Sequence, residues 1–433
     1  MFGLFYGGFM KVGAGNATIN FTEELLPIEG FIGIHDLPKL SVVFIDNNDT
    51  KVVIVSIEIV MLWDDFIERC RKTISNILDV PYENVWIHVT HAITTPHAPG
   101  GPVLGLGGNE VEISENEKKK RKYELEKRKI YEKTIYNALI EALVKASNLR
   151  EAVMFVGTGE CGLICNRDIE TPEGWWIGVD SSHPIKDRMS IISFKDDEGG
   201  YIANLIFYGM KPCVIDNAEM EKGTRLISAD APGLMCRLLE KQYNSPVLYF
   251  TGAAGNTVPI KTAWFDHIGA DGKLMTVDFG VKRGLEYANE IASELAIKAI
   301  DIINNSLLDD SNYISIKQTS FVWQTKDRVP MKLYKEIEYI PEGEKEIPVG
   351  VLKLGETVLV AGKPEINYVT EQQMQKTSSY ANVTYVSMVN GGMKYMPYKK
   401  SYDEVYWEAI ASMLMPGAAE KFVDEAMKLV EEE

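Results

Sequence analysis

The chain has 433 residues, of which 45% are hydrophobic and 25% are charged. This is the composition of an ordinary globular protein, so collagen, coiled-coil and disordered classes are excluded. The formal net charge of −17 argues against a nucleic-acid backbone or an anionic membrane as the principal partner.

The cysteines and the N-terminal segment indicate in which cellular compartment the protein lies. The five cysteines are scattered, and an odd number does not form a disulfide framework. The N-terminal segment has no basic region and no small-residue cleavage site, and no stretch approaches the ~20 apolar residues of a membrane span. We therefore expect a cytoplasmic protein with no transmembrane segment, whose partner is a small molecule and not a nucleic acid.

The first predicted unit is a β-hairpin followed by a helix and a further strand. Apolar, β-branched runs at 41–46 and 52–59 flank the turn sequence Asn-Asn-Asp. Residues 64–78 place apolar side chains at helical spacing, and 85–90 is a strand that ends in a polar, proline-rich loop.

A glycine-rich segment and a long helix follow this unit. Residues 100–108 are a candidate lid, because a loop this rich in glycine is poorly ordered unless it is held. The capping pattern Ser114-x-x-Glu117 predicts the start of a helix over 115–147.

The order hairpin, helix, strand then recurs twice, without detectable sequence identity among the units. In the second unit, the hairpin strands are predicted at 189–194 and 201–208, the helix begins near Asp230, and the closing strand is at 247–250. In the third unit, the hairpin strands are predicted at 350–354 and 357–360, the helix near 371–376, and the closing strand at 383–389. Further helices are predicted over 283–304 and 417–429.

This pattern predicts a mixed α/β protein with a β-sheet core flanked by helices. No proline-, glycine- or serine-rich linker divides the chain. The three units bring their strand-end loops together, and such loops are where ligand sites usually lie.

Two histidines lie on the first of these loops. His91 and His97 bracket a loop directly after a strand, and two imidazoles placed this way can share a metal or relay a proton. Strand alternation turns His88 to the opposite face, which favours a structural role for it.

With this loop among its motifs, the chain resembles the neutral/alkaline non-lysosomal ceramidase family. The matching motifs occur in the family's order from about residue 10 to 430, and they are Gly33-Ile34-His35-Asp36, Asn166-Arg167, Ile-Ser-Ala-Asp-Ala-Pro-Gly at 227–233, Thr-Gly-Ala-Ala-Gly-Asn at 251–256, Pro364-Glu365, 390–408 and 416–420. The resemblance implies one large ceramidase-like domain over 1–433, without the family's C-terminal β-sandwich.

The resemblance also implies a zinc site. The family holds one zinc with two histidines, a glutamate and a tyrosine, which places His91, Glu365 and Tyr395 among the ligands. Lys211 stands where the second histidine belongs, and an ammonium group has no lone pair for a metal. Either His97 supplies the missing ligand, or zinc is lost and Lys211 takes its place.

The family's nucleophile is replaced as well. Its serine position is occupied by Val258, in the run Gly255-Asn256-Thr257-Val258-Pro259, and Thr257 is one residue away. Arg167 resembles an arginine that the family uses near the reacting amide, although a salt bridge with Asp168 or Glu170 is the alternative. The candidate catalytic residues are therefore Arg167, Asn256, Thr257 and Lys211.

Three functions remain open at this point. The first is a metal-dependent hydrolase of an amide or related bond, with water activated by a metal at His91, His97, Glu365 and Tyr395. The second is a catalytically inactive protein that binds a small, lipid-like or other molecule, with Lys211 in place of the zinc histidine. The third makes Lys211 a low-pKa base or a Schiff-base nucleophile. Hydrolysis of ceramide itself is not expected, because a zinc histidine and the serine are both replaced.

Overall fold

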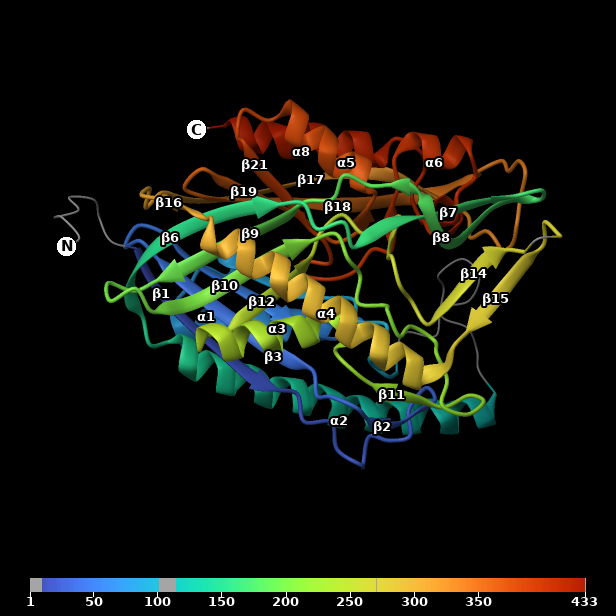
Figure 1. Cartoon of the computed structure of the whole chain (residues 1–433), viewed down its shortest axis with the longest axis horizontal. Helices are drawn as coiled ribbons and strands as arrows, with labels where there is room; N and C mark the ends of the chain where they lie inside the picture. The colour runs from blue at the N-terminus through green and yellow to red at the C-terminus, as the bar shows by residue number, and fades with distance from the viewer. Residues whose placement is uncertain (1–9, 101–113, 270, 433) are drawn as a thin grey trace.

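The computed structural model describes residues 10–100, 114–269 and 271–432, and its two largest β-sheets pack face to face with helices on their outer sides (Figure 1). Apart from Gly100, the predicted glycine-rich lid at 100–108 lies outside the described residues. The predicted mixed α/β class, with sheets flanked by helices, is confirmed.

The larger sheet has the strand order β12-β10-β9-β6-β1-β3-β4-β5, with β16 added to β6. Its strands are β1 (Met10–Thr18), β3 (Lys39–Asp46), β4 (Lys51–Ile57), β5 (Val85–Val89), β6 (Arg150–Gly159), β9 (Met189–Lys195), β10 (Tyr201–Tyr208), β12 (Val247–Thr251) and β16 (Leu307–Asp309). The smaller sheet has the order β17-β18-β19-β21, and its strands are β17 (Ile314–Lys326), β18 (Pro341–Leu354), β19 (Thr357–Gly362) and β21 (Asn382–Val386).

Alternation along the strands gives each sheet two apolar faces. In β3, Val42 and Phe44 point toward the helices, whereas Val43 and Ile45 point into the core between the sheets. Leu352 of the smaller sheet packs into that same core. Strands that are buried on both faces carry near-continuous apolar runs, which is why these segments could be recognised in the sequence.

Helices cover the outer face of each sheet (Figure 1). The larger sheet is covered by α1 (Asp64–Leu78), α2 (Glu115–Ala146), α3 (Asp230–Tyr243) and α4 (Gly280–Asn304), and the smaller sheet by α5 (Tyr368–Thr377) and α8 (Ala418–Glu431). The predicted capping box at Ser114 and Glu117 starts α2. A Cβ at Gly15 would lie 2.3 Å from the Ala142 carbonyl oxygen, so glycine lets α2 pack directly on β1.

The predicted repeat of hairpin, helix and strand is confirmed in all three units. In each, two antiparallel strands precede a helix, and the strand after the helix pairs parallel with the second: β3-β4-β5, β9-β10-β12 and β18-β19-β21. The third closing strand was predicted to reach residue 389 but ends at Val386, and Met388 then turns the chain with a φ of 50°.

Shorter elements connect these layers. They are β2 (Phe31–Ile34), η1 (Tyr82–Asn84), β7 (Ile164–Thr171), β8 (Gly174–Pro184), β11 (Arg225–Ile227), β13 (Thr257–Pro259), β14 (Trp264–Ile268), β15 (Leu274–Asp278), β20 (Glu365–Ile366), β22 (Tyr395–Met396), α6 (Lys399–Asp403) and α7 (Trp407–Ala411). Of these, β7, β8, β20 and β22 position side chains of the candidate site.

His88 joins the ends of the three closing strands. Its Nδ1 lies 2.6 Å from the Ser387 carbonyl oxygen after β21, and its Nε2 accepts a hydrogen bond of 3.1 Å from the Thr251 N–H of β12. These partners require one N–H and one lone pair, hence a neutral ring. Burial lowers the pKa of His88 to about 4, which agrees with the structural role expected for it.

All five cysteines are buried and free, in agreement with the expected absence of a disulfide framework. Among the helices of the described residues, none combines the length and the apolar character that crossing a bilayer requires.

Candidate functional site

A buried ion pair lies where the strand-end loops of the three units meet. The Lys211 ammonium, on the loop after β10, donates to Glu365 Oε2 at 3.1 Å and to the Tyr395 hydroxyl at 3.2 Å, and its Nζ is also 3.1 Å from Glu365 Oε1. His91, on the loop after β5, approaches the same carboxylate, with its Nδ1 3.0 Å from Glu365 Oε1. We call Lys211, Glu365, Tyr395 and His91 the Lys211 cluster.

Backbone pairing fixes the relative positions of these side chains. The short strands β20 and β22 are parallel, and Glu365 is in register with Tyr395, so the two side chains stand next to each other. Asp230 accepts hydrogen bonds of 3.0 Å from the backbone N–H groups of Val214 and Ile215, which holds the loop that carries Lys211.

The loop after β12 approaches the Glu365 strand closely. The Gly255 N–H donates to the Ile366 carbonyl oxygen at 2.8 Å. A Cβ at Gly255 would lie 2.6 Å from that same oxygen. Only glycine permits this approach, so the loop of the second unit fits directly against the strand that carries Glu365.

His91 is the member of the cluster that reaches the surface. Its Nδ1 lies 3.0 Å from Glu365 Oε1, and its side chain is 22% exposed. The His91 backbone has a φ of 59°, in the left-handed region that costs a non-glycine residue about 1–2 kcal/mol. Backbone strain of this kind concentrates at functional positions.

Glu365 and Lys211 favour each other's ionised form. Burial alone would raise the pKa of Glu365, but His91 and Lys211 lower it to about 2. Burial alone would lower the pKa of Lys211, but Glu365 and Tyr395 outweigh it and the pKa is raised. A low-pKa base or a Schiff-base nucleophile requires the opposite shift, so this direction does not favour the third interpretation of Lys211.

Arg167 extends the cluster toward a second group of buried charges. Its guanidinium carbon lies 4.9 Å from the Tyr395 ring centroid and 5.0 Å from that of Trp407. Arg167 is buried, and its side chain is hydrogen-bonded to Tyr395. Burial opposes its charge, but Tyr395, Glu408 and Asp168 outweigh burial and raise its pKa.

Asp168 and Glu408 form a buried carboxylate pair beside Arg167. Asp168 is 1% exposed and Glu408 is 0% exposed. Burial and the neighbouring Glu408 raise the pKa of Asp168 well above its ordinary value. Glu408 Oε1 accepts from Asn367 Nδ2 at 2.8 Å and from Ser401 Oγ at 3.1 Å, and the Asp168 side chain is hydrogen-bonded to Glu408 and Asn256.

The other residues predicted from the sequence have different places. The Asn256 carbonyl oxygen accepts from the Arg167 N–H at 3.1 Å, so Asn256 borders the site. The Thr257 hydroxyl donates to the Gly209 carbonyl oxygen at 2.6 Å and is thereby occupied. His97 is not brought to the cluster, because its ring lies 3.0 Å from Glu29 Oε2 and its side chain is 53% exposed.

The residues present do not fit the zinc that the resemblance implies. Glu365 and Tyr395 direct their oxygens at the Lys211 ammonium, which cannot ligate a metal and repels a cation. His97 contacts Glu29 and does not supply the missing nitrogen. Within the described residues, no three His, Cys, Asp or Glu side chains are grouped as metal ligands.

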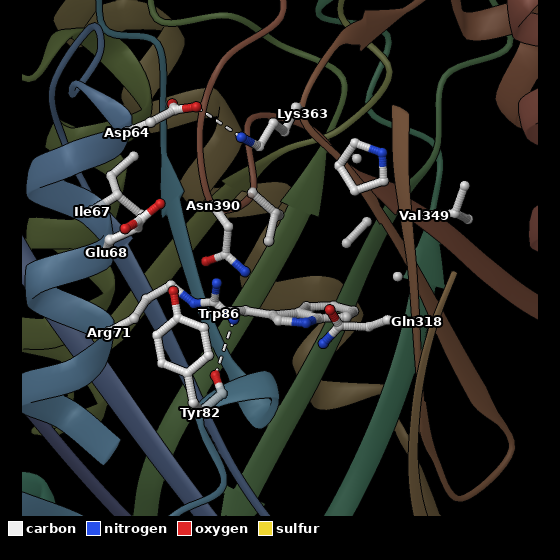
Figure 2. Close-up of a pocket in the computed structure, with 15 residues that line it drawn as sticks. Asp64, Ile67, Glu68, Arg71, Tyr82, Trp86, Gln318, Val349, Lys363 and Asn390 are labelled. Carbon is white, nitrogen blue, oxygen red and sulfur yellow. Dashed lines mark hydrogen bonds and ion pairs between the residues drawn. The ribbon is translucent and has the colours of Figure 1, made fainter. Parts of the chain in front are cut away.

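A separate hollow lies between α1 and the smaller sheet (Figure 2). Its volume is about 160 Å³, and its lining includes Asp64, Glu68, Arg71, Trp86, Val349, Lys363 and Asn390. We call it the α1 pocket. It contains none of the residues that the sequence predicts for the site.

Comparison with known proteins identifies the fold. The structure is similar to that of neutral ceramidase from Pseudomonas aeruginosa, with a TM-score of 0.66 and 16% identity over 98% of this chain and 75% of that chain. It is also similar to a ceramidase complexed with C2, with a TM-score of 0.65 and 15% identity over 98% of this chain and 77% of the other. No family model and no curated protein matches the sequence. The predicted resemblance is therefore confirmed as a ceramidase-like fold in a shorter, divergent chain.

Proposed function

We propose that this protein binds a small molecule at the Lys211 cluster without zinc, with the Lys211 ammonium in the position of the metal. The observation that carries the proposal is the position of Lys211 Nζ, 3.1 Å from both Glu365 oxygens and 3.2 Å from the Tyr395 hydroxyl. The lysine thus meets two of the groups that the resemblance assigns to zinc.

The physical reason lies in charge and in lone pairs. Zinc binding at Glu365 and Tyr395 requires oxygen lone pairs that here accept from Lys211. A divalent ion at that place would either displace the ammonium or lie against it in a low-dielectric interior, where like charges repel strongly. Lys211 itself is a cation that can attract a ligand oxygen, as a metal would.

The buried charges beside the cluster support a bound polar ligand. Arg167, Asp168 and Glu408 are all buried, and burying a charged group costs free energy that contact with a polar ligand offsets. His91, which is 22% exposed, extends the cluster to the surface.

Hydrolysis is a second candidate function, favoured by the contact between His91 and Glu365. With Nδ1 3.0 Å from the carboxylate, the imidazole is oriented to take a proton from water through Nε2 as a general base. The water oxygen would attack an amide carbonyl, Lys211 would stabilise the oxyanion, and the proton would pass to the leaving nitrogen. Ceramide is not the expected substrate, because Val258 replaces the serine and the Thr257 hydroxyl is bound to Gly209.

Metal analysis tests the proposal directly. We expect purified wild-type protein that has never met a chelator to contain no stoichiometric zinc. Lys211→His should bind one zinc per chain, because the imidazole supplies the missing neutral donor next to His91, Glu365 and Tyr395. Lys363→His, which places a histidine at the α1 pocket, is the matched control and should stay zinc-free. One tight zinc in the wild-type protein would overturn the proposal.

A further inference from the structure

Strand β17 forms an edge of the smaller sheet, and part of that edge is open. In the order β17-β18-β19-β21, β17 pairs along its length with β18 alone. Near its C-terminal end the outer side is covered, since the Gln324 carbonyl oxygen accepts from the Met415 N–H at 2.9 Å. At its N-terminal end, Ile314 is buried in the core between the sheets. The open part is therefore residues 316–322, which we call the β17 edge.

Every second residue of the β17 edge turns its backbone N–H and C=O away from β18. Along an antiparallel strand, residues alternate between bonding to one neighbour and facing the opposite way. Tyr313 faces β18, since its carbonyl oxygen accepts from the Gly355 N–H at 2.9 Å, whereas Gln324 faces outward. The outward-facing residues are therefore the even-numbered ones, Ile316, Gln318, Ser320 and Val322. Within the described residues their backbone groups have no backbone partner, and such a row is a template for another strand.

The β17 edge has little of the protection that keeps edge strands apart. Proline and charged side chains are the usual protection, but β17 contains no proline. Lys317 is the one charged residue of the edge, and its ammonium donates to the Glu432 carbonyl oxygen at 3.2 Å. Val322 is 59% exposed although it is apolar. With a net charge of −17, two copies of this chain repel each other, and a nearly uncharged edge is where that repulsion is weakest.

The outward-facing groups are complementary to those of a second copy of the same edge. When two copies run antiparallel about a two-fold axis at Thr319, Ile316 faces Val322 of the second copy, and Gln318 faces Ser320 of the second copy. Each facing pair exchanges two backbone hydrogen bonds, and this register pairs all of the outward-facing residues on both copies. An axis at any other residue leaves at least one of them unpaired. The open edge is thus self-complementary, as a two-fold interface requires.

We propose that the β17 edge is a self-association surface, on which two copies of this chain join their smaller sheets by antiparallel pairing centred on Thr319. The β-branched side chains of Ile316 and Val322 meet across the two strands, a pairing that stabilises sheets. The edge supplies residues 316–322 from each copy, far fewer than the ~20–30 residues a side of a standard interface. The dimer is therefore weak, and we expect it to form at roughly tens of micromolar.

Cysteine cross-linking of the full chain tests the register. In the proposed dimer Thr319 faces itself at a non-hydrogen-bonded pair, with Cα atoms about 4.5 Å apart, which suits a disulfide. Val322 lies about 20 Å from Val322 of the second copy, at ~3.4 Å per residue. Under mild oxidation Thr319→Cys should give a covalent dimer, whereas the exposed thiol of Val322→Cys should not. The native cysteines are buried, which keeps the background low. Cross-linking of Val322→Cys as fast as Thr319→Cys, or of neither, would overturn the proposal.

Sedimentation velocity of the full chain tests the association itself. Wild-type protein should pass from monomer to dimer between about 1 and 200 µM. Ser320→Pro removes an outward N–H and leaves the bonds to β18 in place, and it should weaken the dimer at least about tenfold, since each copy loses one hydrogen bond. Ser320→Ala is the matched control, because it loses the same side-chain bond to Glu346 but keeps the N–H, and it should dimerise like wild type. A wild-type monomer at every concentration, as expected if the edge receives a different protein, or a Ser320→Pro dimer as tight as wild type, would refute the proposal.

Discussion

The Lys211 cluster and the α1 pocket differ in how much buried charge and how much open space they contain. The cluster concentrates charges and a histidine with strained backbone, and its members other than His91 are buried. The α1 pocket offers about 160 Å³ of space, but three of its charged side chains, Asp64, Arg71 and Lys363, are already engaged. Asp64 pairs with Lys363 at 2.9 Å, and Arg71 donates from Nε to the Val85 carbonyl at 3.0 Å and from Nη2 to the Tyr82 carbonyl at 3.0 Å (Figure 2).

The difference follows from which parts of the fold meet. The cluster lies where loops leave the ends of parallel strands in three units, and loops of this kind can carry polar side chains without disturbing the sheets. The α1 pocket lies between a helix and a sheet, where Asn390 and Arg71 are used to satisfy backbone groups around β5. A hollow therefore need not be a site, and a site need not be a large hollow.

The largest expected effect that separates the two regions is that of Lys211→Met. Removing the ammonium leaves the Glu365 carboxylate buried without its cation, and breaking a buried pair from one side costs about 3–5 kcal/mol. Urea denaturation should therefore show a decrease of this size in the free energy of unfolding.

The double variant Lys211→Met with Glu365→Gln serves as the control. It removes both charges, so it should recover a substantial part of the loss caused by Lys211→Met alone. A loss below about 1 kcal/mol for Lys211→Met, the range of an exposed pair, would show that the ion pair is not formed in solution.

The second expected effect is a dependence of the free energy of unfolding on acid, caused by the buried His88. Burial lowers the pKa of His88 from 6.5 to about 4, so the folded protein binds fewer protons there than the unfolded chain. This contribution to stability is fully present above pH 6.5 and is lost as the pH falls through about 4. Its size is about 3 kcal/mol at 1.36 kcal/mol per pKa unit.

His88→Gln isolates this contribution, because an amide can donate to Ser387 and accept from Thr251 but does not titrate. Other buried acids titrate with the opposite sign, since burial raises their pKa values to about 7, 6 and 7 at Asp216, Asp230 and Glu371. The quantity to measure is thus the stability difference between wild type and His88→Gln. A difference that stays constant from pH 7 to pH 4 would contradict a buried, neutral His88.

The three units could be predicted from the sequence because local pattern determines them. Each unit consists of adjacent segments whose periodicity and turns are visible along the chain. The layering could not be predicted, since it depends on β1 and β6 joining the first two units into one sheet, while the third forms a second sheet. Pairing between distant strands depends on tertiary packing, which no local segment records.

The site divides in the same way. Lys211, Glu365, Tyr395 and His91 could be named because each follows a predicted strand and matches a family motif. Asp168 and Glu408 could not be named as residues beside the site. The sequence around an acidic residue on a short element does not reveal that its side chain is buried. Because His97 shares a loop with His91, the sequence predicts that both histidines belong to one site. In the structure His97 contacts Glu29 instead.

The smallest expected effect belongs to the α1 pocket. Lys363→Met breaks the pair with Asp64, whose side chain is 58% exposed. Exposed pairs contribute about 0.2–1 kcal/mol because water screens them and solvates a carboxylate left alone. Urea denaturation should therefore show a loss of at most about 1 kcal/mol, and added salt should shrink it further. A loss as large as that of Lys211→Met would mean that the pocket's ion pair is as buried in solution as the cluster's, and the contrast between the two regions would not hold.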